Sequence, residues 1–193
     1  AQALVVSGPQ EVGMTTIAHA PLSISVVVPA YNAERFIGDT LRSILAQTLP
    51  GQQVVVVDDG SKDGTAALVE REFPSVTLVR SENQGCGAAR GHAIAHSNGD
   101  WIAPCDSDDL WEKDHLQRKA ELLARFPDVD IAFSNCYSFG EKAEPGHRLF
   151  AEAPPHWFDR FRGEAQGAFF RLNTPYLALL HFHPAYQSGL MFK

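Results

Sequence analysis

Cysteine, basic residues and long apolar runs are all scarce in this sequence. Its 193 residues include three cysteines, Cys86, Cys105 and Cys136, an odd number without a CxxC pair, so neither a disulfide framework nor a zinc knuckle is expected. The 16 Lys and Arg are outnumbered by 23 Asp and Glu, and the formal net charge of -7 argues against a protein that tracks nucleic-acid phosphates. No apolar stretch approaches the roughly 20 residues needed to cross a bilayer. We therefore expect no nucleic-acid partner, no transmembrane segment in this chain and a reducing, cytoplasmic setting.

The composition, with 45% hydrophobic and 20% charged residues, is typical of one compact soluble domain. Residues 1–21 lack the basic start and apolar core of a secretory signal, and their Gly, Pro, Ser and Thr content predicts a flexible N-terminal tail. We expect residues 22–139 to form the core of the domain. Residues 140–193 are rich in Pro, Phe and His and predict a peripheral, substrate-covering region of the same domain rather than a second sheet.

Apolar β-branched runs alternate with helix-period segments throughout the predicted core. This rhythm indicates an α/β fold with a mostly parallel, Rossmann-like sheet, covered by helices through right-handed crossovers. In such sheets, ligands bind outside the carboxyl ends of the strands. The expected strands are residues 24–28, 54–57, 76–79, 101–105 and 129–133, and the expected helices are residues 33–47, 66–73, 87–96 and 113–125.

Two acidic groups follow expected strands and fall on the same edge of a parallel sheet. Asp58 and Asp59 come after the second strand, and residues 106–109, with the sequence DSDD, come after the fourth. Clustered carboxylates repel one another unless a cation or a donor compensates them, and hard divalent ions take such oxygen ligands while sharing substrate phosphates. The pattern therefore predicts a metal and diphosphate site. Each group alone also suits a simpler role, an Asp-Gly turn capped by Ser61 or Asp63 in the first case and a solvated helix entry in the second.

Four segments, in order and spacing, resemble the inverting glycosyltransferase family 2, which has the GT-A nucleotide-diphospho-sugar transferase fold. They are VVVPAYN at residues 26–32, VDDGSKDGT at 57–65, NQG followed by AAR within 83–90, and DSDD at 106–109. The resemblance covers roughly residues 22–135. It makes residues 22–139 the nucleotide-sugar-binding core and residues 140–193 the start of an incomplete acceptor-side region.

The resemblance also implies a role for each matching position. The turn at 29–32 passes the nucleobase and ribose, Asp59 accepts a hydrogen bond from a base N3–H, which suits uracil, and Asp58 orients its loop. Arg90 offers a charged fork to base or phosphate from a glycine-bearing lip. Asp108 ligates the Mn²⁺ or Mg²⁺ that bridges the phosphates, and Asp106 faces ribose or metal. The implied donor-binding residues are Pro29, Ala30, Tyr31, Asn32, Glu34, Asp59, Asn83, Gly85, Arg90, Asp106 and Ser107, and the implied metal ligands are Asp108 and Asp106.

The implied reaction is metal-assisted transfer of a sugar from a nucleoside-diphosphate sugar, a UDP-sugar above all, to an acceptor hydroxyl with inversion, as in a hexosyltransferase. Inversion needs a general base, which in this family lies well downstream of the metal motif, so we expect it beyond Lys193, with Glu164 and Asp159 as alternatives within the chain. The implied acceptor is a glycan or a lipid-linked glycan of the cell surface. This acceptor favours a cytoplasmic protein, which in the case of a lipid-linked acceptor would be peripheral at the inner face of the membrane. An oligomer is compatible with this reading.

Two rival interpretations stay open at this point. A non-catalytic module of the same fold would bind nucleotide or glycan without turnover. A sugar-phosphate nucleotidyltransferase shares the sheet and the metal requirement, but it would need a glycine-rich basic loop after the first strand, where this chain has Pro29, Ala30, Tyr31 and Asn32.

Overall fold

The computed structural model describes residues 3–6, 22–49, 52–136, 153–154, 156, 160, 162–166, 169–172 and 187–193. The chain divides into two compact units. The first consists of Pro21–Gln117 with Lys193, and the second of Ala1–Ala20 with Arg118–Phe192.

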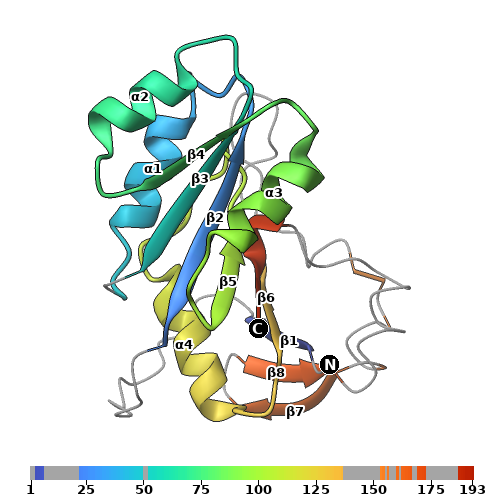
Figure 1. Cartoon of the computed structure of the whole chain (residues 1–193). Helices are drawn as coiled ribbons and strands as arrows, with labels where there is room; N and C mark the ends of the chain where they lie inside the picture. Colours follow the sequence, from blue (N-terminus) through green and yellow to red (C-terminus); the bar gives the residue numbers. More distant parts are fainter. Residues whose placement is uncertain are drawn as a thin grey trace. The chain divides into compact units, whose positions relative to one another are not determined.

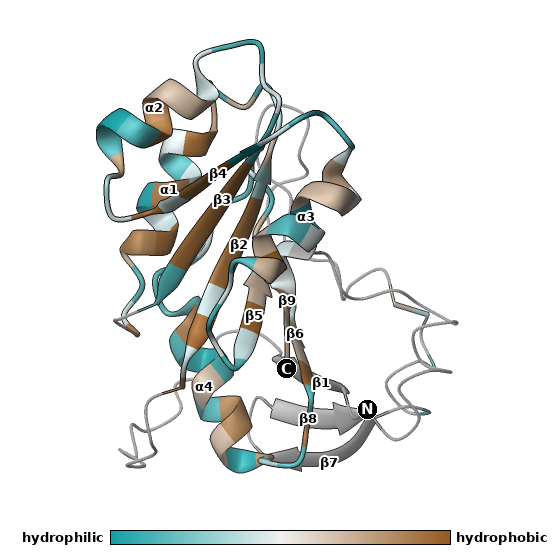
Figure 2. Cartoon of the chain, viewed as in Figure 1, coloured by the Kyte–Doolittle hydropathy of each residue, from teal (hydrophilic) through white to brown (hydrophobic). Residues whose placement is uncertain are grey.

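The first unit contains four parallel strands in the order β4-β3-β2-β5 (Figure 1). Their bounds are Ile24–Ala30 for β2, Gln53–Asp59 for β3, Thr77–Ser81 for β4 and Trp101–Pro104 for β5. All seven residues of β2 are buried, and Val55, Val56 and Val57 of β3 are completely buried. Figure 2 colours much of β2, β3 and β4 as hydrophobic. The apolar β-branched runs thus form parallel strands covered on both faces, as the sequence predicts.

Three helices connect these strands: α1 (Ile37–Leu45), α2 (Thr65–Glu72) and α3 (Cys86–Ala95). The chain steps outward from β2 through α1 and α2 to β4, then returns across the sheet through α3 to β5. Because such crossovers are right-handed, this change of direction puts α1 and α2 on one face and α3 on the other, as Figure 1 shows. The strand order therefore reverses between β2 and β5, and the carboxyl ends at such a reversal are where open α/β sheets bind ligands.

The second unit contains five strands in the order β9-β6-β1-β8-β7. Strand β1 is parallel to β6 and antiparallel to β8, while β9 is antiparallel to β6 and β7 is antiparallel to β8. The bounds are Ala3–Val6 for β1, Ile131–Ser134 for β6, Arg162–Gln166 for β7, Phe169–Leu172 for β8 and Leu190–Phe192 for β9, which directly follows the 3₁₀ helix η2 at Gln187–Gly189. Helix α4 (His115–Arg125) begins in the first unit and continues into the second.

A fully buried lysine holds the end of η2 in the second unit. Lys119 on α4 is 0% exposed, and its Nζ donates a hydrogen bond of 2.6 Å to the carbonyl oxygen of Gly189. The hydroxyl of Ser134 donates to the same carbonyl at 3.4 Å. Burial lowers the pKa of Lys119 to about 7, because the charged ammonium loses its hydration.

The structure confirms the five predicted strands and the four predicted helices of the core, with shifts of a few residues at their ends. It differs from the sequence-based prediction at both ends of the chain. Residues 3–6 form strand β1, although they belong to the expected flexible tail, and β7 and β8 form a sheet edge where the sequence predicts an irregular region. The residues of β7, Arg-Gly-Glu-Ala-Gln, do not alternate between apolar and polar, so the strand has no local signature. The chain passes from the first unit to the second between residues 117 and 118, and the predicted division of one domain into a donor side and an acceptor side near residue 139 stays a prediction.

No helix in the described part of the chain combines the length and the apolar character needed to span a membrane.

Candidate functional site

The residues predicted to bind the donor lie at or just after the carboxyl ends of the first unit's parallel strands. Ala30 ends β2 and is in register with Asp58 of β3, while Asp59 is in register with Ser81, the last residue of β4. Asp106 follows β5 by two residues. The fold therefore brings the four sequence segments to one edge of one sheet, beside the reversal in strand order.

The loop after β2 is tied to the loop after β3 through Asn32. Asn32 has a positive φ of 50°, a conformation that Asn adopts more readily than most residues. Its backbone N–H donates to the hydroxyl of Ser61 at 2.9 Å, and its side-chain Oδ1 accepts from the N–H of Lys62 at 2.8 Å. The N–H of Ala33 donates to the hydroxyl of Thr65 at 2.8 Å. The side chain of Asn32 thus binds within the protein, and its predicted contact with the donor stays a prediction.

Glu34 forms a second, reciprocal tie between the same two loops. Its N–H donates to Asp63 Oδ2 at 3.2 Å, and its Oε2 accepts from the N–H of Gly64 at 2.9 Å. Asp63 also accepts from the N–H of Thr65 at 3.0 Å and from its hydroxyl at 2.5 Å. Slight burial works to raise the pKa of Asp63, but the hydrogen bonds from Thr65 and Glu34 outweigh it and lower the pKa. Each loop therefore satisfies backbone N–H groups of the other.

Tyr31, in contrast, is left available at the same turn. Its side chain is 49% exposed, although it is a large aromatic residue next to a completely buried strand. An exposed aromatic ring at a strand end offers a flat apolar surface to a ligand.

The two aspartates at the end of β3 differ in their surroundings. Asp59 is 2% exposed and binds the loop after β4, accepting from the N–H of Gln84 at 3.0 Å and of Gly85 at 2.8 Å, and from the hydroxyl of Ser81 at 3.3 Å. Asp58 is 5% exposed, and its Oδ1 accepts no hydrogen bond among the described residues. Asp59 thus orients the loop after β4, and the role that the resemblance implies for Asp58 stays a prediction. A carboxylate has about four acceptor positions, so Asp59 retains capacity for a ligand.

The loop after β4, residues 82–85, forms an exposed lip in front of α3. Gly60 lets this lip approach closely, because it has a φ of 73° and a Cβ there would lie 2.9 Å from the backbone nitrogen of Asn83. Gly85 has a φ of 92° at the start of α3, and a Cβ on Gly85 or Gly87 would meet no atom within 4 Å. Bare backbone therefore faces open space at the lip, as close approach of a ligand requires.

Arg90 and Asp106, which come from two of the predicted segments, form an ion pair. Arg90 Nη2 lies 2.8 Å from Asp106 Oδ1, and their side chains are 19% and 37% exposed. The same nitrogen lies 3.3 Å from the sulfur of Cys86, one turn earlier on α3. In this state Arg90 neutralises Asp106, so a ligand or a metal at this position has to share or displace the guanidinium.

The acidic loop after β5 leaves one carboxylate open. Asp108 is exposed and makes no hydrogen bond or ion pair within the described part of the chain. The loop turns through a hydrogen bond of 3.1 Å from the N–H of Asp109 to the carbonyl of Asp106, and the carbonyl of Ser107 accepts a hydrogen bond from Thr40 at 2.9 Å. Trp101 and Trp111 flank the loop and are buried, and Trp111 stacks on His115 with ring centroids 4.5 Å apart.

The carboxylates of the site form a small donor set for a metal ion. Among the described residues, no group of three or more His, Cys, Asp and Glu side chains is placed to hold a metal ion by itself. Asp108 with Asp106 gives two carboxylates at most, which fits Mg²⁺ or Mn²⁺ that completes its coordination with phosphate oxygens and water. Of the alternative bases, Glu164 lies in strand β7, while Asp159 lies outside the described residues.

Sequence reasoning missed how these loops are held in place. Ser61 and Asp63, which it offers only as caps of a turn, bind the loop after β2 together with Thr65. Thr40, Ser43 and Gln47 of the α1 region bind the loop after β5. The local signal for these three is their spacing, which places polar groups along one side of an otherwise apolar helix face.

A parallel sheet with this order reversal, an exposed aromatic residue after β2, and carboxylates after β3 and β5 fit the GT-A fold of nucleotide-diphospho-sugar transferases. Comparison with solved structures agrees. Residues 1–349 of TarS from S. aureus, in complex with UDP-GlcNAc, are similar with a TM-score of 0.62 and 25% identity, over 89% of this chain and 45% of that one. The mannosyltransferase PcManGT from Pyrobaculum calidifontis, in complex with GDP-Man and Mn²⁺, is similar with a TM-score of 0.60 and 26% identity, over 84% and 48%.

The profile described as Glycosyl transferase family 2 matches residues 25–185, and the chain belongs to this family. A curated relative is the putative teichuronic acid biosynthesis glycosyltransferase TuaG of Bacillus subtilis, which is 35% identical over 105 residues, 52% of this chain and 41% of TuaG. The chain spans less than half the length of the relatives named here.

Proposed function

We propose that this chain binds a nucleoside-diphosphate sugar, a UDP-sugar above all, and takes part in transferring the sugar with inversion to an acceptor hydroxyl in cell-surface glycan synthesis. The observation that carries the proposal is the convergence of Tyr31, Asp59, Arg90 and Asp108 on the carboxyl edge of one parallel sheet. The complexes of TarS with UDP-GlcNAc and of PcManGT with GDP-Man and Mn²⁺ support it, because both proteins have this fold.

The nucleoside would lie across the ends of β2 and β3. The exposed ring of Tyr31 offers a stacking surface, and Pro29, Ala30 and Asn32 form the turn that passes base and ribose. Asp59 is fixed by two backbone N–H groups and still has acceptor capacity for the N3–H of uracil. Because the same carboxylate holds Gln84 and Gly85, binding of the base would be coupled to the position of the lip and of Asn83.

The diphosphate would lie between the lip and the acidic loop. Asp108, helped by Asp106, would hold Mn²⁺ or Mg²⁺, which when bound supplies positive charge to the leaving diphosphate. Arg90 lies beside Asp106 and can turn its guanidinium towards a phosphate once another cation neutralises that carboxylate. Ser107 would line this part of the site together with the backbone at Gly85 and Gly87, where a Cβ would meet no atom within 4 Å.

The functional division that we propose follows from this assignment. Residues 22–139 bind the donor, and residues 140–193 belong to the acceptor side, where a glycan or a lipid-linked acceptor would bind. Such acceptors place the reaction in the cytoplasm or at the inner face of the membrane. We assign no general base.

Calorimetry with UDP, in the presence and absence of Mn²⁺, tests the donor assignment. We expect UDP to bind more tightly with Mn²⁺ present, and Asp108→Ala to abolish this metal-dependent gain while leaving the weaker metal-free binding. Asp39→Ala, which removes an exposed carboxylate on α1, should change neither quantity. The proposal is wrong if no nucleoside diphosphate binds with or without metal, or if Asp108→Ala retains the full effect of Mn²⁺.

A second measurement separates a transferase from a non-catalytic module. The protein would be incubated with a panel of nucleotide sugars, and release of the nucleoside diphosphate would be followed. Release of the nucleoside diphosphate that Asp108→Ala abolishes would identify a transferase. Because we expect the general base beyond Lys193, binding of a donor without release favours the module only in a chain that includes the base.

A further inference from the structure

Three polar residues lie in a row along the α1 region, at spacings of three and four residues. Thr40 is completely buried, Gln47 is 9% exposed, and Ser43 lies half-buried between them. Their neighbours on the helix, Leu41 and Ile44, are buried apolar residues. We call Thr40, Ser43 and Gln47 the α1 polar row. Polar groups at buried positions need partners, and all three find them in the acidic loop and the segment after it.

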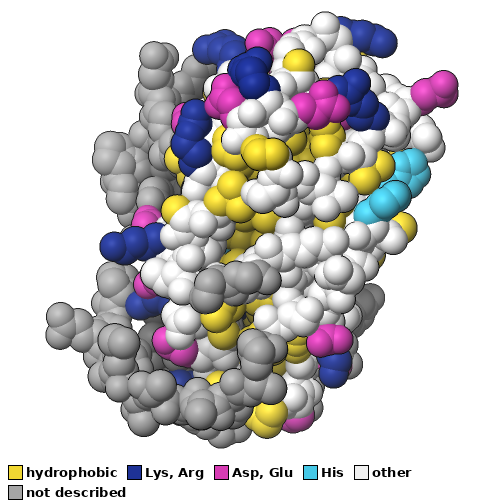
Figure 3. Space-filling model, turned by 60° about the vertical axis from the view of Figure 1, so that its left-hand side comes forward, with side chains coloured by type: hydrophobic (Ala, Val, Ile, Leu, Met, Phe, Trp, Pro, Cys, Tyr) yellow, Lys and Arg dark blue, Asp and Glu magenta, His cyan; other side chains and the backbone are white. Residues whose placement is uncertain are grey.

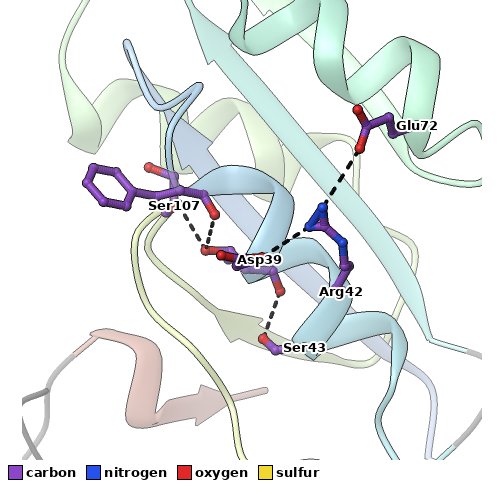
Figure 4. A network of polar contacts seen from close by, with 7 residues as sticks. Asp39, Arg42, Ser43, Glu72 and Ser107 are labelled. Atoms are coloured by element: carbon purple, nitrogen blue, oxygen red, sulfur yellow. Dashed lines mark hydrogen bonds and ion pairs between the residues drawn. The ribbon is translucent and has the colours of Figure 1, made fainter. Parts of the chain in front are cut away.

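Thr40 and Ser43 bind the acidic loop and the first residues after it. Thr40 Oγ1 donates to the carbonyl oxygen of Ser107 at 2.9 Å, and Ser43 Oγ accepts from the N–H of Trp111 at 3.2 Å. Ser43 in turn donates to the carbonyl of Thr40 at 2.8 Å. Figure 4 shows Ser43 and Ser107 in this network and Arg42 directed towards Glu72.

Gln47 binds the segment that leads from the acidic loop into α4. Its Nε2 donates to the carbonyl of Glu112 at 2.8 Å and to that of Ser43 at 3.1 Å, and its Oε1 accepts from the N–H of Leu116 at 2.9 Å. Next to it, the N–H of Thr48 donates to the carbonyl of Lys113 at 2.8 Å. The side chain of Gln47 therefore uses both its donor and acceptor groups to hold two points of one segment.

Asp108 lies inside the segment that the row holds, yet its own side chain is exposed and makes no hydrogen bond or ion pair within the described part of the chain. Its position is consequently set by its backbone, which is held on one side at Ser107 and on the other at Trp111 and Glu112. We infer that the α1 polar row consists of positioning residues that hold the Asp108 carboxylate in place for a divalent cation bound with a diphosphate. This inference rests on the proposed function.

Thr40 permits a sharp test, because Val keeps the shape of Thr without the hydroxyl, whereas Ser keeps the hydroxyl without the methyl group. Thr40→Val removes the donor to Ser107, and Thr40→Ser keeps it. We expect Thr40→Val to weaken binding of UDP with Mn²⁺ about tenfold, the effect of one lost buried hydrogen bond, and Thr40→Ser to restore most of the affinity. Metal-free UDP binding should stay unchanged in both variants. Arg42→Gln, on the exposed side of the same helix, serves as a control.

Hydrogen exchange of the backbone N–H groups of residues 106–112, without ligand, gives a second readout. Thr40→Val should accelerate exchange there, and neither Thr40→Ser nor Arg42→Gln should. If wild-type protein binds UDP better with Mn²⁺ but Thr40→Val changes neither exchange nor affinity, the positioning role is wrong and the proposed function stands. Faster exchange with unchanged Mn²⁺-dependent affinity also overturns the inference, because the row then holds the loop without serving the cation. Absence of any UDP binding by wild type refutes the proposed function, and the metal role with it.

Discussion

Replacement of Lys119 by Met should change the pH dependence of the protein's free energy of unfolding. Lys119 is completely buried, and burial lowers its pKa from 10.5 to about 7. Between these two values the unfolded chain binds a proton that the folded chain does not, so the lysine makes the wild-type free energy of unfolding rise with pH. At about 1.4 kcal/mol per pH unit, the whole change amounts to about 5 kcal/mol.

In the Met variant this contribution is absent, and an apolar chain of similar length fills the site. At pH 6 we expect Lys119→Met to be more stable than wild type, because it removes a buried charge. This advantage should shrink by about 3 kcal/mol between pH 6 and pH 9.5, where the wild-type amine is neutral and still donates to Gly189.

Urea denaturation of both proteins at several pH values, followed by tryptophan fluorescence, measures this difference. Taking the difference between the two proteins cancels the titration of the remaining groups. Lys113→Met, at an exposed position just before α4, should show no such trend. A difference between Lys119→Met and wild type that stays constant from pH 6 to pH 9.5 would refute the reasoning.

Two further predictions concern the first unit. Gly99→Ala should destabilise this unit by more than about 2 kcal/mol, because the added Cβ would lie 2.5 Å from the backbone nitrogen of Ser25. Gly91→Ala should instead stabilise it by about 0.5–1 kcal/mol, because Gly91 lies inside α3 and its added Cβ would meet no atom within 4 Å. Thermal unfolding of the two variants measures both effects. Asp59→Asn should release part of the lip at a cost of about 1–3 kcal/mol, because the single oxygen of an amide cannot accept from both N–H groups that the carboxylate binds. Hydrogen exchange should become faster at Gln84 and Gly85 and stay the same elsewhere, and unchanged exchange at these two residues would contradict the prediction.

The sequence predicts the strands and helices of the core well, because their signals are local. The apolar run at residues 24–28 and the helical spacing of Ile37, Leu41 and Ile44 each suffice to identify an element. Strands β1 and β7 were not predictable in this way. The partners of β1, strands β6 and β8, lie far along the chain, and β7 lacks an alternating pattern although it pairs with the nearby β8.

In the candidate site, too, the residues with a local signal could be predicted and the long-range contacts could not. Motif residues such as Asp59 and Asp108 can be found by their place after a strand, and the fold puts them at one sheet edge. The hydrogen bond from Thr40 to Ser107 spans 67 positions, and the ion pair of Arg90 with Asp106 joins two separate motifs. Such contacts depend on where helices pack on the sheet, and no short stretch of sequence records them.

The reciprocal ties between the loops after β2 and β3 have a consequence for inheritance and engineering. Asn32 and Glu34 on one loop each exchange hydrogen bonds with residues 61–64 of the other, so the conformation of each loop depends on the side chains of its neighbour. A loop transplanted alone from a relative would arrive without its complement and leave several backbone N–H groups unpaired. The two segments should therefore be exchanged together, and a recombination breakpoint between residues 34 and 61 should be tolerated only where both parents carry compatible side chains at these positions.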